Sequence, residues 1–267
     1  MLKQCVRGLT SSPLLPPSMY GWRGLASLAT SPLLPPSMYG WRVAALRAWL
    51  ASQGAEGKPV TMEMMAEAGH LDQFHYRGLV CNQEIATLLQ VNTYQNLLLL
   101  PQVDSGDRLL DIGAGIGGPA RYIGHATGCR VDGVDIQQDL ITEANKVTKL
   151  VGLSDRVQFW TEDACSRDFG NSLLEPCYDG YYSILVNLHM PKEPRQRMFE
   201  NIGRVVKETG ALVIEDYVLK DDTEPLVEEE QQTLRDVVGV AFIPSKSEYK
   251  VSFSRLPMNV NFLSPQL

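Results

Sequence analysis

RLLDIGAGIGGPARYI, at residues 108–123, carries the clearest structural signal in the chain. A short apolar run, Arg108–Ile112, leads into a glycine-rich turn, and a segment that favours a helix follows at Gly118–Thr127. Gly113 and Gly115 allow a tight turn in which ligand atoms can approach bare backbone. Free N–H groups at the start of the helix can bind polar ligand atoms. This order of strand, glycine turn and helix predicts a nucleotide-type binding site.

Strands and helices continue to alternate after this turn. The expected strands are Cys129–Val134, Val157–Trp160, Gly180–Val186 and Ala211–Tyr217, and the expected helices between them are Gln138–Val151 and Arg195–Lys207. On the N-terminal side, Met62–His70 and Asn82–Leu100 are compatible with helices. Buried strands that alternate with helices predict a parallel sheet covered on both faces. The expected fold is therefore α/β, a Rossmann-like, doubly wound, mostly parallel sheet.

Acidic residues follow the second and third strands, where such sheets bind ligands. Asp135 ends the second strand, and its carboxylate can accept both hydroxyls of a ribose; the alternative is a solvated loop acid. Asp132 lies nearby but within the strand. Asp163 and Ala164 follow the third strand, where a carboxylate can accept from the amine of adenine. Together with the glycine turn, these positions predict an adenosine site.

Asp111 distinguishes between adenosine cofactors. It stands two residues before Gly113-x-Gly115, and a carboxylate there would repel the pyrophosphate of a dinucleotide. The ammonium and sulfonium groups of S-adenosylmethionine would instead be attracted to it. An NAD-dependent Rossmann oxidoreductase, which uses similar glycines, is the alternative.

LLDIGAGIGGPARYI resembles motif I of the class I S-adenosylmethionine-dependent methyltransferases. The block LDQFHYRG, Leu71–Gly78, is similar to the lead-in of the sarcosine/dimethylglycine N-methyltransferase-like group, which is related to the phosphoethanolamine methyltransferases. Later motifs match in order over residues 70–250, at Asp135-Ile136, Asp163-Ala164, Asn187-Leu188-His189 and Ile214–Tyr217.

The resemblance implies S-adenosylmethionine as cofactor and a small molecule, such as a glycine derivative or phosphoethanolamine, as methyl acceptor. The residues it assigns to the cofactor are Asp111, Gly113, Ala114, Gly115, Asp135, Ile136, Asp163, Ala164 and Asn187.

His189 and Tyr76 are the candidate catalytic residues. His189 follows the fourth strand, where the family's active site opens, and its imidazole could accept a proton from an amine or orient it. Tyr76, like His75, lies in the lead-in that resembles a lid over the cofactor. The alternatives are an internally bonded histidine and a tyrosine that packs in the core.

The C-terminal part departs from the family pattern in two ways. Lys207–Gly210, KETG, stands where the family has a Lys-Pro-Gly-Gly turn before the fifth strand. After that strand the sequence predicts an acidic helix at about Pro225–Val240 and coil at Ser247–Leu267, with no convincing sixth and seventh strands. A catalytically weak, methyltransferase-like binding protein is therefore a further alternative.

The first 55 residues have a different composition from the rest. They contain five basic residues and no Asp or Glu, so they carry +5, whereas the whole chain carries −7. SPLLPPSMYGWR occurs twice, at Ser12–Arg23 and Ser31–Arg42. A basic, acid-free, Ser-rich start predicts a mitochondrial transit peptide, with a cytoplasmic protein carrying a disordered tail as the alternative. Within this leader, Val43–Leu50 could form a short amphipathic helix.

The expected organisation is a disordered leader at 1–55, a methyltransferase domain at 60–250 and an irregular tail at 251–267. The sequence has no run of 18 apolar residues, which argues against a membrane span. The net charge of −7 argues against a nucleic-acid partner. The five cysteines form no C-x-x-C pair and the four histidines are scattered, so no metal site is expected. The sequence does not indicate the oligomeric state.

Overall fold

The computed structural model describes residues 40–54, 59–75, 77–90, 106–173, 175–219, 226–235, 240 and 242–256. Residues 1–39, with the first copy of the repeat and most of the predicted leader, lie outside this range, so the predicted transit peptide stays a prediction.

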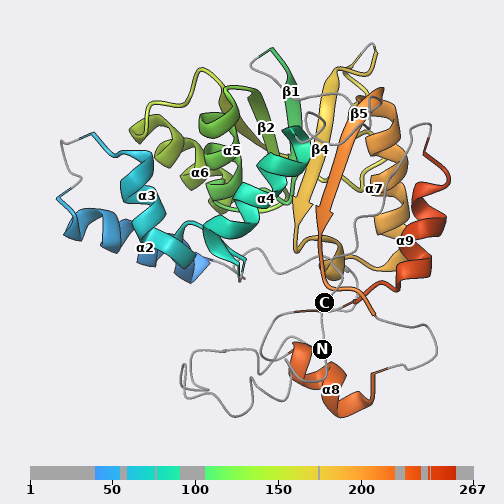
Figure 1. Ribbon diagram of the computed structural model, residues 1–267. Helices are drawn as coiled ribbons and strands as arrows, with labels where there is room; N and C mark the ends of the chain where they lie inside the picture. Colours follow the sequence, from blue (N-terminus) through green and yellow to red (C-terminus); the bar gives the residue numbers. More distant parts are fainter. Residues whose placement is uncertain are drawn as a thin grey trace.

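A five-stranded parallel sheet forms the centre of the molecule (Figure 1). Its strands are β1 (Arg108–Ile112), β2 (Arg130–Asp135), β3 (Val157–Thr161), β4 (Tyr178–Ile184) and β5 (Val206–Glu215). They lie in the order β3-β2-β1-β4-β5, and every neighbouring pair is parallel. The strand order therefore reverses beside β1, which confirms the expected Rossmann-like fold.

Helices cover both faces of the sheet (Figure 1). On one face lie α4 (Gly78–Gln90), α5 (Gly118–Thr127) and α6 (Gln138–Leu150), and on the other lie α7 (Lys192–Val205) and α9 (Lys246–Phe253). A short α8 (Glu228–Thr233) and the 3-10 turns η2 (Gly69–Leu71) and η3 (Asn187–His189) complete the elements. Among the described helices, none is long and apolar enough to cross a membrane.

Successive strand residues point to opposite faces of the sheet, which gives two cores. Leu109 of β1 packs with α4, α5 and α6 residues such as Ile85, Ile123 and Ala144. Leu110, its neighbour, packs on the other face with α7 and α9. The buried strands thus present apolar side chains to both layers of helices, as parallel sheets require.

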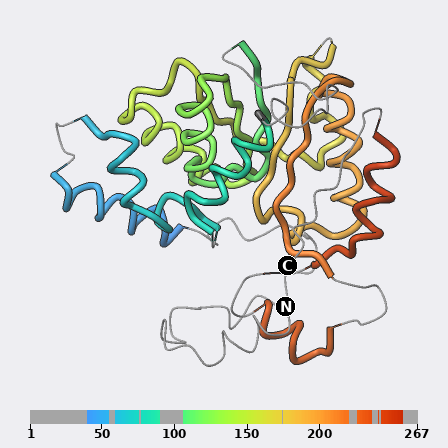
Figure 2. The backbone as a smooth tube through the Cα atoms, viewed as in Figure 1, coloured from blue at the N-terminus to red at the C-terminus, as the bar shows by residue number. Residues whose placement is uncertain are grey.

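The last part of the predicted disordered leader is folded. Gly40–Ser52 forms α2, which lies beside α3 (Met62–Ala68) at the end of the molecule opposite α9 (Figure 2). Val43, Leu46 and Leu50 are buried in a core with residues of α3 and α6. The amphipathic helix expected within this region is therefore confirmed, but the expected disorder of residues 40–52 is wrong.

Several predicted boundaries change in the C-terminal half. β4 begins and ends two residues earlier than expected, and β5 begins at Val206, so Lys207–Gly210 lies within the strand and not in a turn. The acidic helix is confined to Glu228–Thr233 in the described residues. The same range contains no further strand of this sheet after β5.

The C-terminal segment predicted as coil contains α9. Ser245 caps this helix by accepting a hydrogen bond from the backbone N–H of Glu248, and the Glu248 carboxylate accepts from the Ser245 N–H at 3.0 Å. Tyr249 and Phe253 lie one turn apart and bury their rings against Phe199 of α7. The prediction of coil is therefore wrong for Lys246–Phe253, and residues 257–267 lie outside the described range.

Candidate functional site

A cavity opens at the carboxyl ends of β1, β2 and β4, beside the point where the strand order reverses. This is where open α/β sheets bind their ligands. Of the residues predicted from the sequence, those that line it are Asp111, Gly113, Ala114, Gly115, Asp135, Ile136, Asp163, Ala164 and His189. The topology thus brings together residues from four separate segments of the chain.

The remaining two predicted residues are not placed in the cavity. Asn187 is fully buried, and its side-chain amide faces the Ser183 hydroxyl at 3.5 Å, so it supports the wall from behind. Its predicted contact with the cofactor is not supported. Tyr76 lies outside the described residues.

The glycine turn is held by its own backbone hydrogen bonds. The N–H groups of Gly113 and Ala114 both donate to the Val134 carbonyl of β2, at 2.8 and 3.0 Å. Gly113 has φ +73°, and a Cβ there would lie 2.4 Å from a methyl group of Val186. These two N–H groups are therefore occupied within the protein, whereas the expectation of free N–H groups concerned the start of α5 and stays a prediction.

Asp135 links the turn to β2. Its two carboxylate oxygens accept from the backbone N–H groups of Gly115 and Gln137, each at 2.9 Å. Each oxygen keeps a lone pair, so both can still accept a hydroxyl from a ligand. Asp132, by contrast, is paired with Arg108 and accepts from the Tyr178 hydroxyl at 3.1 Å, and it does not line the cavity.

Asp111 places a buried carboxyl at the end of β1. It is 3% exposed, and its Oδ2 has no hydrogen-bond partner among the described residues. Burial raises the pKa of Asp111 to about 8, and the Tyr182 hydroxyl opposes this shift. The ionised form of this carboxyl group is stabilised by a cation or a hydrogen-bond donor that enters the cavity.

The lead-in segment forms another wall of the cavity. The residues of this segment that line it are Asp72, Phe74 and His75, and none of them is among the cofactor residues predicted from the sequence. A fully buried ion pair between Asp72 and Arg121 of α5 fixes this segment. A Cβ at Gly118 would lie 2.3 Å from the Asp72 carbonyl oxygen, so the segment covers the start of α5.

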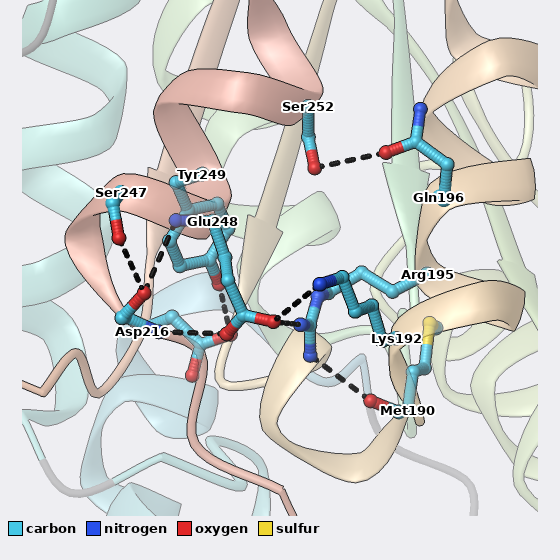
Figure 3. Close-up of polar contacts among 10 residues, drawn as sticks. Met190, Lys192, Arg195, Gln196, Asp216, Ser247, Glu248, Tyr249 and Ser252 are labelled. Atoms are coloured by element: carbon cyan, nitrogen blue, oxygen red, sulfur yellow. Dashed lines mark hydrogen bonds and ion pairs between the residues drawn. The ribbon is translucent and has the colours of Figure 1, made fainter. Parts of the chain in front are cut away.

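His189 lies on η3, and this turn is bonded to Asp216, which Figure 3 shows beside Tyr249 of α9. The Asp216 carboxylate accepts from the Leu188 N–H at 3.2 Å and from the Tyr249 hydroxyl of α9 at 3.0 Å. Burial raises the pKa of Asp216 to about 6. Arg195 and Lys192 of α7 pair with Glu248 at 3.5 and 3.8 Å, so α9 is tied to the helix that follows η3.

The cavity is rich in acceptors and poor in cations. Its carboxyl side chains are Asp72, Asp111, Asp135, Glu162 and Asp163, and no Lys or Arg is among the described residues that line it. Two buried acceptor oxygens in its wall, Asp111 Oδ2 and Gln137 Oε1, lack a donor within the described part of the chain. Buried polar groups without partners are rare. The cavity therefore favours a ligand that carries N–H and O–H donors and positive charge.

Comparisons with known proteins identify the type of domain. Residues 109–210 match the model of a family described as a methyltransferase domain. The chain is 29% identical over 150 residues to the sterol 24-C-methyltransferase of Eremothecium gossypii, which covers 56% of this chain and 39% of that protein. It is 27% identical over 155 residues to the phosphoethanolamine N-methyltransferase of Plasmodium falciparum, with 56% of each protein covered. The chain thus spans less than two thirds of either relative.

A solved structure shows the same fold. Phosphoethanolamine N-methyltransferase 2 of Haemonchus contortus, in complex with phosphomonomethylethanolamine and S-adenosylhomocysteine, superimposes with a TM-score of 0.54 and 22% identity, over 67% of this chain and 37% of that one. Residues 109–210 therefore match a methyltransferase domain, and the fold of the described chain is that of this solved methyltransferase.

Proposed function

We propose that this chain transfers the methyl group of S-adenosylmethionine to the nitrogen of a small amine, such as a glycine derivative or phosphoethanolamine. The observation that carries the proposal is the cavity lined by the carboxyl groups of Asp111, Asp135, Glu162 and Asp163 and by no described Lys or Arg, since the carboxylate of Asp72 is already paired with Arg121. A methylated amine and the sulfonium of the cofactor are both cationic, and carboxylates stabilise them at short range. The relative from Plasmodium falciparum, named a phosphoethanolamine N-methyltransferase, supports the choice of an amine.

The described residues suit S-adenosylmethionine. Asp111 Oδ2 is a buried acceptor without a donor, which an ammonium group satisfies. Asp135 can accept the ribose hydroxyls, and Asp163 can accept from the adenine amine. A dinucleotide fits less well, because the N–H groups of Gly113, Ala114 and Gly115 already donate within the protein and cannot cradle a pyrophosphate.

When bound, the cofactor supplies a methyl group on a positively charged sulfur, ready for displacement. The protein's part is to align the acceptor and exclude water. His189, on the β4 side of the cavity, takes the proton that the amine nitrogen loses, so that a free lone pair attacks the methyl carbon. The lead-in segment closes the cavity on the β1 side through Phe74 and His75.

Binding and turnover test the proposal separately. Calorimetry with S-adenosylhomocysteine should show binding, and NAD should not bind. Methyl transfer from labelled S-adenosylmethionine is then measured for glycine, sarcosine, dimethylglycine and phosphoethanolamine, with a sterol as the carbon acceptor that the Eremothecium gossypii relative suggests. Methylation of the sterol alone would contradict N-methylation, and binding without any turnover would favour a binding protein.

Replacing Asp135 by alanine is expected to weaken binding of S-adenosylhomocysteine by about 1–3 kcal/mol, since a charged hydrogen-bond partner of the ribose is lost. Isothermal calorimetry measures the effect. Asp139→Ala is the matched control, because Asp139 is an exposed acid in the first turn of α6 and does not line the cavity. Unchanged affinity in Asp135→Ala would remove Asp135 from the ribose site.

Asp111 should make stability depend on pH. Its pKa is raised from 3.8 to about 8 in the folded protein, so the folded state binds one more proton than the unfolded chain between those values. The free energy of unfolding that Asp111 contributes is therefore complete at low pH and falls as the pH rises toward about 8. Thermal melts from pH 5 to pH 8, expressed as wild type minus Asp111→Asn, should show this decline.

The same carboxyl should release a proton when the cofactor binds. An ammonium group stabilises ionised Asp111, so binding lowers the pKa of Asp111 and a proton leaves at pH 7. Calorimetry of S-adenosylhomocysteine in buffers of different ionisation enthalpy counts this proton. Equal proton release by wild type and Asp111→Asn would show that Asp111 does not meet the cofactor's charge.

A further inference from the structure

A chain of hydrogen bonds runs through the lead-in segment to His75. Arg121 donates to Asp72 in a fully buried ion pair. The Gln73 side-chain nitrogen donates to the other Asp72 oxygen at 3.2 Å, which fixes the orientation of the amide because a carboxylate in this pair is an acceptor. The Gln73 Oε1 therefore faces the opposite way, where Asn82 Nδ2 donates to it at 2.7 Å.

This chain determines the tautomer of His75. His75 Nε2 lies 3.1 Å from Gln73 Oε1, and since an amide oxygen only accepts, Nε2 must carry the proton. Burial lowers the pKa of His75 to about 4, so the ring is neutral at pH 7 and carries one proton. Nδ1 is therefore left with an unprotonated lone pair and acts as an acceptor.

His75 belongs to the cavity wall. His75 is 5% exposed and lines the cavity, and Nδ1 has no partner among the described residues. Phe74, the preceding residue, lies against the glycine turn, because a Cβ at Gly115 would be 3.3 Å from its ring. His75 thus reaches the cavity from the segment that covers the glycine turn.

We propose that His75 Nδ1 accepts a hydrogen bond from an N–H or O–H donor of the bound cofactor, and that Gln73 is the positioning residue that keeps Nδ1 unprotonated. The inference rests on the proposed function, and it adds a cofactor contact from the lead-in segment. The hydrogen bonds from Arg121 through Asp72 to Gln73 then fix the tautomer of His75, so that Nδ1 remains an acceptor for the ligand. A lead-in displaced from α5 would lose this contact, so docking of the segment and cofactor binding favour each other.

Nitrogen NMR of histidine tests the inference directly. The full chain is labelled with ¹⁵N-histidine, and its four histidines are told apart by the signals that disappear in His75→Phe. We expect the Nε2–H tautomer without ligand and a displaced Nδ1 signal at saturating S-adenosylhomocysteine, with Nε2 still protonated. An Nδ1–H tautomer, or an Nδ1 signal that does not move at saturation, overturns the inference.

Variants provide a second readout. His75→Phe keeps the ring volume and removes the acceptor, so affinity for S-adenosylhomocysteine should fall about 3–10-fold with little change in Tm. Gln73→Met should let His75 populate both tautomers and weaken binding less. His125→Phe, an exposed histidine of α5 outside the cavity, is the matched control and should bind normally. A lowered Tm with unchanged affinity in His75→Phe would show a purely structural role and overturn the inference.

The measurements distinguish failure of the proposed function from failure of the proposed role of His75. If the wild-type chain does not bind S-adenosylhomocysteine by calorimetry, the proposed function is wrong. If it binds while the Nδ1 signal stays in place, the function stands and the role of His75 is wrong. Should His75→Phe fail to fold, the wild-type spectra with and without S-adenosylhomocysteine still decide the question.

Discussion

Arg121→Met is expected to lower the free energy of unfolding by about 3–5 kcal/mol, because it leaves a buried carboxylate without its cation. Arg121 and Asp72 are 0% and 1% exposed, so water cannot replace the lost partner. The Arg121 guanidinium also donates to the Ala144 carbonyl at 3.3 Å and to the Thr148 hydroxyl at 3.2 Å. These bonds tie the lead-in segment, α5 and α6 together, and all of them are lost in the variant.

Urea denaturation at neutral pH measures this effect. Adding Asp72→Asn to Arg121→Met removes the uncompensated charge and should recover part of the loss. Arg235→Met is the control for an exposed pair, because Arg235 and its partner Glu228 are 37% and 80% exposed and such pairs contribute about 0–1 kcal/mol. A loss below about 1 kcal/mol in Arg121→Met would mean that the pair is hydrated in solution.

The same variant should weaken cofactor binding. Asp72 holds the segment that places Phe74 and His75 in the cavity wall, and Arg121 is the one cation paired with it among the described residues. Affinity for S-adenosylhomocysteine should therefore fall together with stability, although Arg121 itself does not line the cavity. A variant that is destabilised but binds normally would separate the lead-in from the cofactor site.

Local patterns predicted the central sheet well. The strand, glycine turn and helix at residues 108–127 are determined by residues that are close together in the sequence. β1 and α5 therefore have the predicted bounds. The prediction of coil missed α9, although a local signal was present, because Ser245 and Glu248 form a capping box and Tyr249 and Phe253 are four residues apart. The packing of α2 was hidden, since its apolar stripe lies in a leader whose basic, Pro-rich composition favours disorder.

From the sequence, site residues could be predicted only where they lie at the carboxyl ends of strands. Asp111, Asp135 and Asp163 follow successive strands, so topology alone brings them to one edge. The pairing of Asp72 with Arg121 joins residues 49 positions apart, and no local pattern reports it. No local pattern reports the hydrogen bonds of the backbone N–H groups in the glycine turn either, because their acceptor, the Val134 carbonyl, belongs to another strand.

His189→Ala is expected to lower kcat by about 10²-fold or more while affinity for S-adenosylhomocysteine stays nearly unchanged, the effect of an interaction made mainly in the transition state. His189 lines the cavity from η3, the turn that follows β4. Its position is maintained by Asp216, which accepts from the N–H of the adjacent Leu188. The imidazole is therefore held where it can take a proton from an amine next to the methyl group.

Steady-state kinetics with whichever amine the wild-type protein methylates, combined with thermal melts, decides between two roles. A base predicts a low kcat with a normal Tm, and activity that recovers partly at higher pH, where more of the amine is already deprotonated. A capping residue predicts a lowered Tm with normal turnover per folded molecule. Asp216→Asn provides the comparison, since it disturbs η3 without removing the imidazole and should affect both quantities. Normal kcat in His189→Ala would leave alignment in the carboxylate-lined cavity, without a general base, as the mechanism of transfer.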